Sequence, residues 1–292
     1  MVKREIKEKE EQVDKKTMNE LINLALASSK VKKITVEQEN GEFDMRTNIN
    51  IFIYGQIGGT KSTLLNEIAK KTKSIEPFTD LTYPALIGSV DKMTKQLLIG
   101  ACWECRNSLL LLDEFDFGKR EKSDIRALLQ LIEGGKYNKK MASFSAKTEE
   151  EDEDLRYKFE NGQFNIKTRF SLVIVTMKYP YTSQNQELQA LITRSICLPW
   201  YPEKKDLMRI AQGYPLFNFV DKTPKNLEIR VKKIDYDKIY NYVFDRTNHP
   251  NALRIIGDCT RIFVIEKKHR TDLYDLLIKL GTKKFQSKAP KK

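Results

Sequence analysis

The chain has 292 residues, of which 40% are hydrophobic and 32% are charged, and its formal net charge is +12 at pH 7. This composition is typical of a globular protein with a substantial core, and no apolar stretch approaches the ~20 residues that a membrane-spanning helix needs. The charged first sixteen residues do not resemble a signal peptide, so we expect a cytoplasmic protein that does not enter membranes. The excess of Lys and Arg favours a polyanionic partner, although acids and bases are mixed along most of the chain.

The four cysteines are too few and too scattered to form a disulfide framework in a chain of this size. Cys102 and Cys105 have the spacing of metal ligands, but there is no second pair, and His249 and His269 are the only histidines. We therefore expect buried thiols and no zinc site.

The first 46 residues predict a small opening module. Residues 1–16 alternate in charge and predict a solvated arm, residues 17–28 have the apolar spacing of a short helix, and residues 31–45 predict a hairpin that turns at Asn40-Gly41. This module is too small to be an independent DNA-binding domain.

Residues 49–65 predict a buried strand that runs through a glycine-containing turn into a helix, as in a phosphate-binding loop. Lys61 would reach the β- and γ-phosphates of a nucleotide, and the Ser62 hydroxyl would bind Mg²⁺. Thr60 stands where the common motif has Gly, and a tight strand-to-helix connection is the alternative reading. The predicted cofactor-binding residues are Gly55, Gly58, Gly59, Thr60, Lys61, Ser62 and Thr63.

A second apolar strand, residues 108–112, ends in Asp113-Glu114. A carboxylate in the position of Asp113 would hold Mg²⁺ together with Ser62 or through water, and Glu114 would orient and deprotonate the attacking water. The order and spacing of the two motifs predict an ATPase that needs ATP and Mg²⁺.

Residues 79–90 predict irregular structure, residues 91–105 predict a helix, and residues 123–133 predict an amphipathic helix that ends at two glycines.

In the segment 136–169, residues 136–145 alternate like a strand and residues 148–154 form an acidic block. Asn161-Gly162 then predicts a hairpin in which Phe159 faces Phe164 and Tyr157 faces Ile166. Three basic residues near this ribbon are candidate DNA contacts: Arg156, Lys158 and Lys167. We expect the acidic block to point away from them.

The remaining segments complete an α/β fold. Residues 169–177 predict a buried strand that ends near Thr176, and residues 190–199 predict a helix end that leads through Arg194 into a short strand. Four helices are then expected at 202–213, 235–246, 251–266 and 273–280. We expect a nucleotide-binding α/β domain at 47–200, with an enlarged hairpin at 136–169, and a small helical lid with a basic tail at 201–292.

Together these features resemble the AAA+ ATPases, and in particular the minichromosome maintenance (MCM) helicases, over roughly residues 46–265. Residues 46–62 (RTNINIFIYGQIGGTKS) and 86–116 resemble the family's nucleotide-binding motifs, and residues 190–197 resemble the segment that carries its arginine finger. The resemblance implies an AAA+ P-loop fold, a finger role for Arg194, a sensor role for Arg254 with Arg261 on one helix, and assembly into a ring, most simply a hexamer, that acts on DNA.

The sequence departs from this family in three places. Residues 1–46 are too short for the large N-terminal DNA-binding region of MCM proteins. The family's sensor-1 Asn is replaced: Thr176 is the nearest polar residue, whereas strict alignment reaches Met177. The hairpin that points basic residues at DNA in the family is enlarged here and contains the acidic block.

Three functions follow from these observations. The first is an MCM-like ATPase that couples hydrolysis to DNA binding, remodelling or unwinding in replication. The alternative is an AAA+ switch or remodeller that acts on a protein partner, and stimulation of hydrolysis by DNA distinguishes the two. A nucleotide-binding structural protein without turnover is disfavoured because both Asp113 and Glu114 are present.

Overall fold

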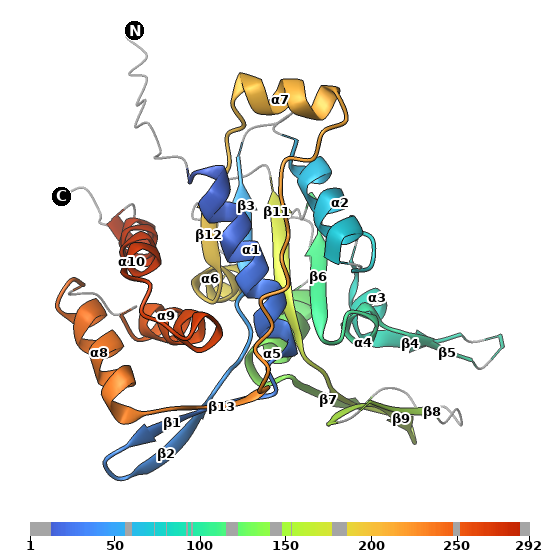
Figure 1. The fold of residues 1–292 in the computed structure, drawn as a ribbon. Helices are drawn as coiled ribbons and strands as arrows, with labels where there is room; N and C mark the ends of the chain where they lie inside the picture. Colours follow the sequence, from blue (N-terminus) through green and yellow to red (C-terminus); the bar gives the residue numbers. More distant parts are fainter. Residues whose placement is uncertain are drawn as a thin grey trace, which may run out of the picture.

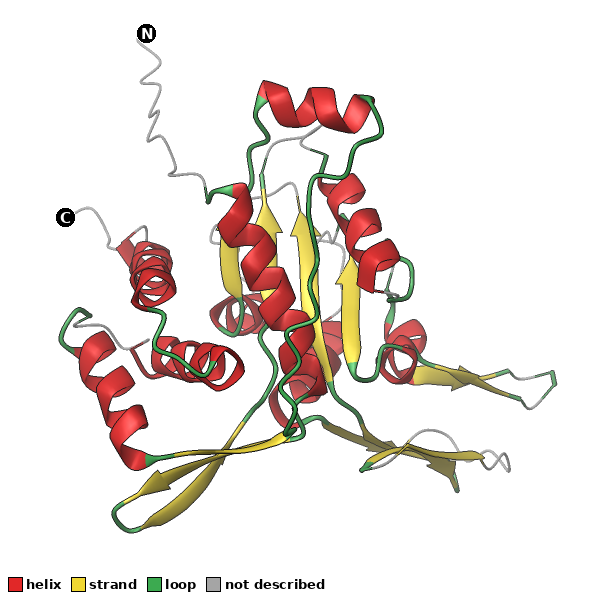
Figure 2. Cartoon of the chain, viewed as in Figure 1, coloured by secondary structure: helices red, strands yellow, loops and turns green. Residues whose placement is uncertain are grey.

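The central feature of the fold is a parallel sheet of four strands. The computed structural model describes residues 13–55, 60–72, 74–79, 81–91, 93–94, 96–114, 122–140, 148–152, 154–176, 186–247 and 252–286. The strands lie in the order β12 (Ile196–Pro199), β3 (Ile51–Tyr54), β11 (Phe170–Thr176) and β6 (Ser108–Leu112). Nearly every residue in them is buried, as expected for a parallel sheet that is covered on both faces (Figures 1 and 2).

Alternate side chains of these strands enter two separate cores. One core contains Ile51, Ile53 and residues of α1 (Lys15–Lys30), α2 (Lys61–Thr72), α8 (Lys233–Phe244), α9 (Ala252–Glu266) and α10 (Thr271–Gln286). The opposite core contains Phe52, Tyr54 and residues of α5 (Lys122–Gly134) and α6 (Gln186–Thr193). The mixed α/β class and the helices on both sides of a parallel sheet agree with the sequence-based expectation.

Helix α1 packs into the core that contains Ile51 and Ile53, and it does not form a separate N-terminal module. Asp14 caps it by accepting a hydrogen bond from Thr17 N at 3.0 Å, and Met18, Leu21 and Ile22 are fully buried. The helix lies across the main sheet in Figure 1. Residues before 46 and after 201 therefore share one core with the central strands.

The predicted hairpin in residues 31–45 is confirmed as β1 (Lys33–Gln38) and β2 (Gly41–Met45). It has a partner that the sequence did not reveal, because β13 (Glu228–Val231) pairs parallel to β1. This strand lies in the part that we expected to be purely helical. With only four residues, its alternation is too short to stand out from the sequence around it.

The expectation of irregular structure is wrong for residues 83–90, and among the described residues of 91–105 the expected helix is present only at 101–104. These residues form α3 (Tyr83–Ile87), β4 (Gly88–Val90), β5 (Leu97–Ile99) and α4 (Ala101–Glu104), with β4 and β5 paired in a projecting hairpin (Figure 1). The Asp91 carboxylate accepts hydrogen bonds from Met93 N at 2.7 Å and Thr94 N at 3.0 Å. This local bonding favours a turn over continuation of a helix.

A second sheet, here called the hairpin sheet, contains β7 (Lys136–Lys140), β10 (Gln163–Lys167), β9 (Leu155–Glu160) and β8 (Thr148–Asp152), in that spatial order. The predicted Asn161-Gly162 turn is confirmed, with both residues at positive φ. The two predicted cross-strand pairs are also confirmed, and the rings of Phe159 and Phe164 lie 4.7 Å apart.

The expectation that the acidic block points away from the basic ribbon is wrong. The block forms β8, which pairs antiparallel with β9 and places Glu149 opposite Lys158 and Glu151 opposite Arg156. Side chains of opposite charge that face each other across two strands stabilise the pairing. Attraction between the two segments therefore contributes to their arrangement.

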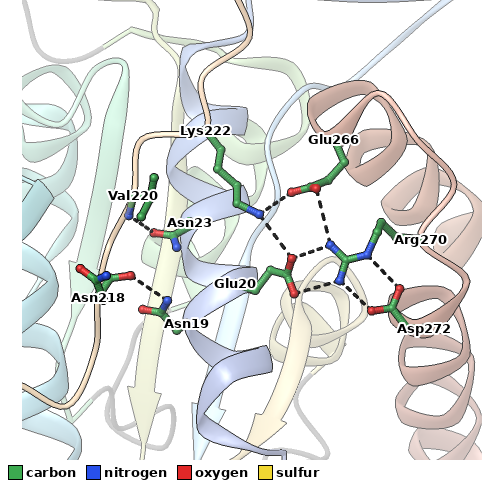
Figure 3. A network of polar contacts seen from close by, with 9 residues as sticks. All are labelled: Asn19, Glu20, Asn23, Asn218, Val220, Lys222, Glu266, Arg270 and Asp272. Carbon is green, nitrogen blue, oxygen red and sulfur yellow. Dashed lines mark hydrogen bonds and ion pairs between the residues drawn. The ribbon is translucent and has the colours of Figure 1, made fainter.

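The predicted helices after residue 200 are confirmed as α7 (Lys204–Ala211) and α8 to α10. A polar network attaches the end of α9 and the start of α10 to α1, as Figure 3 shows. Glu20 of α1 accepts hydrogen bonds from Arg270, which precedes α10, and from Lys222 at 3.3 Å. Helix α9 packs beside α1, α10 packs beside β12, and α8 packs against α9.

Candidate functional site

The two predicted nucleotide-binding motifs meet at one edge of the main sheet. Because its strands are parallel, their carboxyl ends lie at the same edge, where Gly55 follows β3 and Asp113 follows β6. Strand β11 lies between them, with Thr176 paired to Tyr54 and Ile174 paired to Leu112. The register thus places Thr176 between the glycine turn and the acidic pair.

Lys61 is the first residue of α2 and is only 6% exposed. Its ammonium group donates a hydrogen bond to Gly55 O at 3.1 Å. Burial lowers the pKa of Lys61, and the negative charges of Asp113 and Glu114 act in the opposite direction. Lys61 therefore lies within electrostatic reach of both carboxylates, in a place where further negative charge would stabilise it.

The acidic pair is held in a defined backbone conformation. Asp113 N donates to Phe78 O at 2.9 Å, and the Asp113 carboxylate accepts a hydrogen bond from Glu114 N at 2.9 Å. Glu114 and Thr60 both have positive φ, at 48° and 57°, which is uncommon for residues other than glycine. Such conformations concentrate at functional sites, and here two of them flank Lys61.

The connections that follow two adjacent strands, β3 and β11, leave this edge toward opposite faces of the sheet. The helix that follows β3, α2, packs on one face of the sheet, whereas the helix that follows β11, α6, packs on the other. In open parallel sheets, ligands bind outside the carboxyl ends of strands whose connections leave toward opposite faces. In Figure 1 the arrowheads of β3 and β11 mark this edge, and α7 crosses beyond it.

The remaining predicted cofactor residues agree with this geometry as far as they are described. Ser62 is exposed and Thr63 is partly buried in the first turn of α2. Gly58, Gly59 and Met177 lie outside the described residues. The helix N-terminus and the Lys61 ammonium are both favourable toward phosphate.

Within the described part of the chain, no group of three or more His, Cys, Asp or Glu side chains could hold a metal. The predicted donors for Mg²⁺ are one hydroxyl, Ser62, and one carboxylate, Asp113. That set fits Mg²⁺, which is commonly bound through one or two protein oxygens together with substrate phosphates and water. All four cysteines are buried as free thiols, and burial raises the pKa of Cys105 to about 12.

Arg194 lies at the opposite edge of the sheet. It precedes β12, whose Ile196 pairs with Ile51, so six residue levels separate Arg194 from Gly55, or roughly 20 Å along a strand. Its side chain contacts the Glu133 carboxylate and donates to Ala190 O at 2.8 Å. It cannot reach a phosphate held by Lys61 of the same chain.

Arg254 lies beside Arg194 and away from Lys61. Burial lowers the pKa of Arg254, and the positive charge of Arg194 lowers it further. The Nη1 atom of Arg254 is buried without a hydrogen-bond partner among the described residues. Arg261, in contrast, is almost fully buried and pairs with Asp258, so its role in this fold is structural.

The three candidate DNA contacts fall into two groups. Arg156 and Lys158 are paired with carboxylates of β8, whereas Lys167 has no ion pair with a described residue. Sequence reasoning overlooked Lys136 and Lys140, which lie on the same face of the hairpin sheet as Lys167. The alternation of residues 136–140 predicts a strand, and in a strand Lys136 and Lys140 lie on the same face.

No protein-family model matches the chain, and the search of curated proteins found no match. In the part of the chain that the structure describes, no helix is both long enough and apolar enough to cross a membrane.

Proposed function

We propose that this protein is a P-loop ATPase of the AAA+ type. The observation that carries the proposal is the buried Lys61 at the first position of α2, within electrostatic reach of an Asp-Glu pair on the same edge of a parallel sheet. A buried ammonium beside carboxylates, at a helix N-terminus and at the carboxyl ends of parallel strands, fits the phosphates of a nucleotide with a divalent cation.

Each residue at this edge has a distinct role in the proposal. Lys61 binds the β- and γ-phosphates, while Ser62 and Asp113 hold the cation. Mg²⁺, when bound, neutralises charge on the phosphate oxygens. Glu114 accepts a proton from the attacking water, and the Thr176 hydroxyl lies between the two motifs, where it can orient that water or a phosphate oxygen.

The positions of the arginines support an assembly in which neighbouring subunits complete each site. Arg194 is roughly 20 Å from the level of Gly55 along the sheet, so it can act only on a nucleotide held by another copy. Arg254 lies beside it and would face the same neighbour. A closed ring, with a hexamer as the expected form, satisfies every site at once.

DNA is the proposed partner. The β4–β5 hairpin and the hairpin sheet project toward the same side of the molecule in Figure 1, and the hairpin sheet carries the exposed Lys136, Lys140 and Lys167. A protein partner remains the second candidate, and one observation favours it: acidic β8 neutralises Arg156 and Lys158, two of the three predicted DNA contacts.

The decisive experiment measures ATP binding and turnover with Mg²⁺, with and without single- and double-stranded DNA. Lys61→Ala should lose ATP binding, because it removes the charge on the phosphates. Glu114→Gln should bind ATP but turn over at least about 10²-fold more slowly, because it cannot take a proton. Lys70→Ala, an exposed lysine on the same helix, is the matched control and should behave like the wild type.

Equal turnover by Glu114→Gln and the wild type would contradict the catalytic assignment. Hydrolysis that DNA does not stimulate at any salt concentration would favour the protein-remodelling function.

A further inference from the structure

The hairpin sheet has one buried face and one solvent-facing face. Tyr137, Tyr157 and Phe164 point to the buried face, where they join the core. The strand register puts the remaining alternate residues on the other side, here called the front face. Its members are Glu149 and Glu151 of β8, Arg156, Lys158 and Glu160 of β9, Gln163, Asn165 and Lys167 of β10, and Lys136, Asn138 and Lys140 of β7.

Strand β8 is fixed to the protein through its own buried-side carboxylates. Glu150 accepts a hydrogen bond from Trp103 Nε1 at 2.6 Å, and Asp152 accepts one from Arg106 Nε at 2.9 Å. The Arg106 guanidinium also lies 4.6 Å from the centre of the Trp103 ring. The acidic strand is therefore held in the sheet by contacts on its buried side, and its other two carboxylates, Glu149 and Glu151, lie on the front face.

On the front face these carboxylates neutralise the basic residues of β9. Arg156 Nη2 lies 2.6 Å from Glu151, and Lys158 Nζ lies 3.4 Å from Glu149 and 3.1 Å from Glu160. The pKa of Lys158 is raised by the hydrogen bond to Glu160 and then by the charge of Glu149. A phosphate approaching β9 would have to compete with carboxylates already in place.

The lysines of β7 and β10 have no such partner. Lys136 and Lys167 face each other directly across the two strands, and no described carboxylate pairs with either of them or with Lys140. Like charges in directly opposed positions destabilise a sheet. An arrangement that lowers stability in the free protein is explained if an external anion binds between the two ammonium groups.

The surface around Lys136 and Lys167 is concave. A cavity of about 550 Å³ is lined by Lys136, Lys167, Asn138 and Asn165 together with residues of β8 and β9. Its two acidic residues are already occupied, since Glu151 pairs with Arg156 and Asp154 pairs with Arg169 at 3.2 Å. The positive charge left in the cavity is that of the two lysines.

We propose that Lys136, Lys140 and Lys167 form the phosphate-binding surface of the hairpin sheet, and that Glu149 and Glu151 confine a nucleic acid to it by occupying Arg156 and Lys158. The partner is a nucleic-acid backbone: lysine contacts to phosphates carry no sequence information, and the buried aromatic rings of this sheet cannot stack on bases. This inference rests on the DNA partner of the proposed function.

The test measures binding of a labelled oligonucleotide to the full chain at several salt concentrations. Lys136→Ala with Lys167→Ala should weaken binding and reduce the salt slope by up to about two, one for each lost phosphate contact. Arg156→Ala with Lys158→Ala should change the slope little, because those two charges are already neutralised.

Removing the competing carboxylates should have the opposite effect. Glu149→Gln with Glu151→Gln should tighten binding about tenfold at low salt and raise the slope by up to about one, because Arg156 loses its partners whereas Lys158 keeps Glu160. The gain should disappear when Arg156→Ala and Lys158→Ala are added. Glu150→Gln is the matched control, because it lies on the same strand but faces Trp103, and it should leave affinity and slope near wild type.

Two results would overturn the inference. The first is an equal gain from Glu150→Gln, which would mean that net charge alone decides affinity. The second is unchanged binding in the Glu149→Gln, Glu151→Gln protein, with thermal unfolding showing that each variant is folded.

ATP turnover is measured on the same proteins. Turnover without any DNA binding overturns this inference alone, whereas the expected binding pattern without turnover overturns the ATPase proposal alone.

Discussion

Gly55 illustrates how one residue serves both packing and the proposed site. A Cβ atom at this position would lie 2.1 Å from the carbonyl oxygen of Trp200, a backbone atom that cannot rotate away. Trp200 N in turn donates to Tyr54 O at 2.8 Å, which holds the two chain segments together. The close approach of β3 and the segment after β12 thus requires glycine here, independently of any phosphate.

Gly55→Ala should therefore lower the free energy of unfolding by about 3 kcal/mol or more, since overpacking against fixed backbone is costly. Gly134→Ala is the control, because a Cβ there meets nothing within 4 Å and the residue ends a helix. It should be neutral or stabilise by about 0.5–1 kcal/mol. Chemical denaturation of both variants measures the difference, and equal stability would contradict the packing role.

At the scale of elements, the polar network in Figure 3 connects α1 to the C-terminal helices. Arg270 donates to both carboxylate oxygens of Glu20, and Lys222 reaches both Glu20 and Glu266. These side chains are mostly buried, with Glu20 18% and Arg270 15% exposed. Partly buried, hydrogen-bonded charges of this kind depend strongly on each partner being present.

Glu20→Gln should lower the free energy of unfolding at neutral pH by about 1.5–3 kcal/mol. The hydrogen bond from Arg270 lowers the pKa of Glu20 below its ordinary value of 4.5. The contribution of Glu20 is therefore complete above that value and is lost as pH falls through the lowered pKa. Stability curves of the two proteins should converge in acid, and Glu76→Gln, an exposed acid, should show no such difference.

At the scale of the whole molecule, the proposed chemistry is divided between two edges of the sheet. Lys61, Asp113 and Glu114 lie at the carboxyl edge, whereas Arg194 precedes a strand at the amino edge. One chain thus has the proposed nucleotide site at one edge of the sheet and the proposed arginine donor at the other. Such a head-to-tail arrangement closes into a ring when the rotation between subunits permits it.

Mixing Lys61→Ala with Arg194→Ala should restore part of the ATPase activity that each protein lacks alone. Some mixed interfaces then combine an intact Lys61 with an intact Arg194, and an arginine supplied in trans is worth roughly 10³-fold or more in rate. Mixing Lys61→Ala with Glu114→Gln is the control and should restore nothing, because both residues belong to the same site of one chain. Failure of the first mixture, with subunit exchange demonstrated, would contradict the trans role.

Several features of this protein were determined by local sequence alone. The apolar runs at 51–54, 108–112 and 170–176 must be buried, so they form the central strands. Asn161-Gly162 sets the turn and therefore the register of its hairpin. Because the strands run parallel, the two predicted nucleotide-binding motifs, each at the carboxyl end of a strand, lie at one edge of the sheet.

Other features were decided only by tertiary structure. Strand β13 pairs with β1 although almost 200 residues separate them in the chain. Neither local sequence indicates that the other segment is its pairing partner. The acidic strand lies beside β9 because Trp103 and Arg106 bind its other face, which no reading of the charges in 148–154 reveals. Periodicity specifies which side chains leave water, whereas the partner of each exposed strand edge or charge depends on which distant surfaces folding brings alongside it.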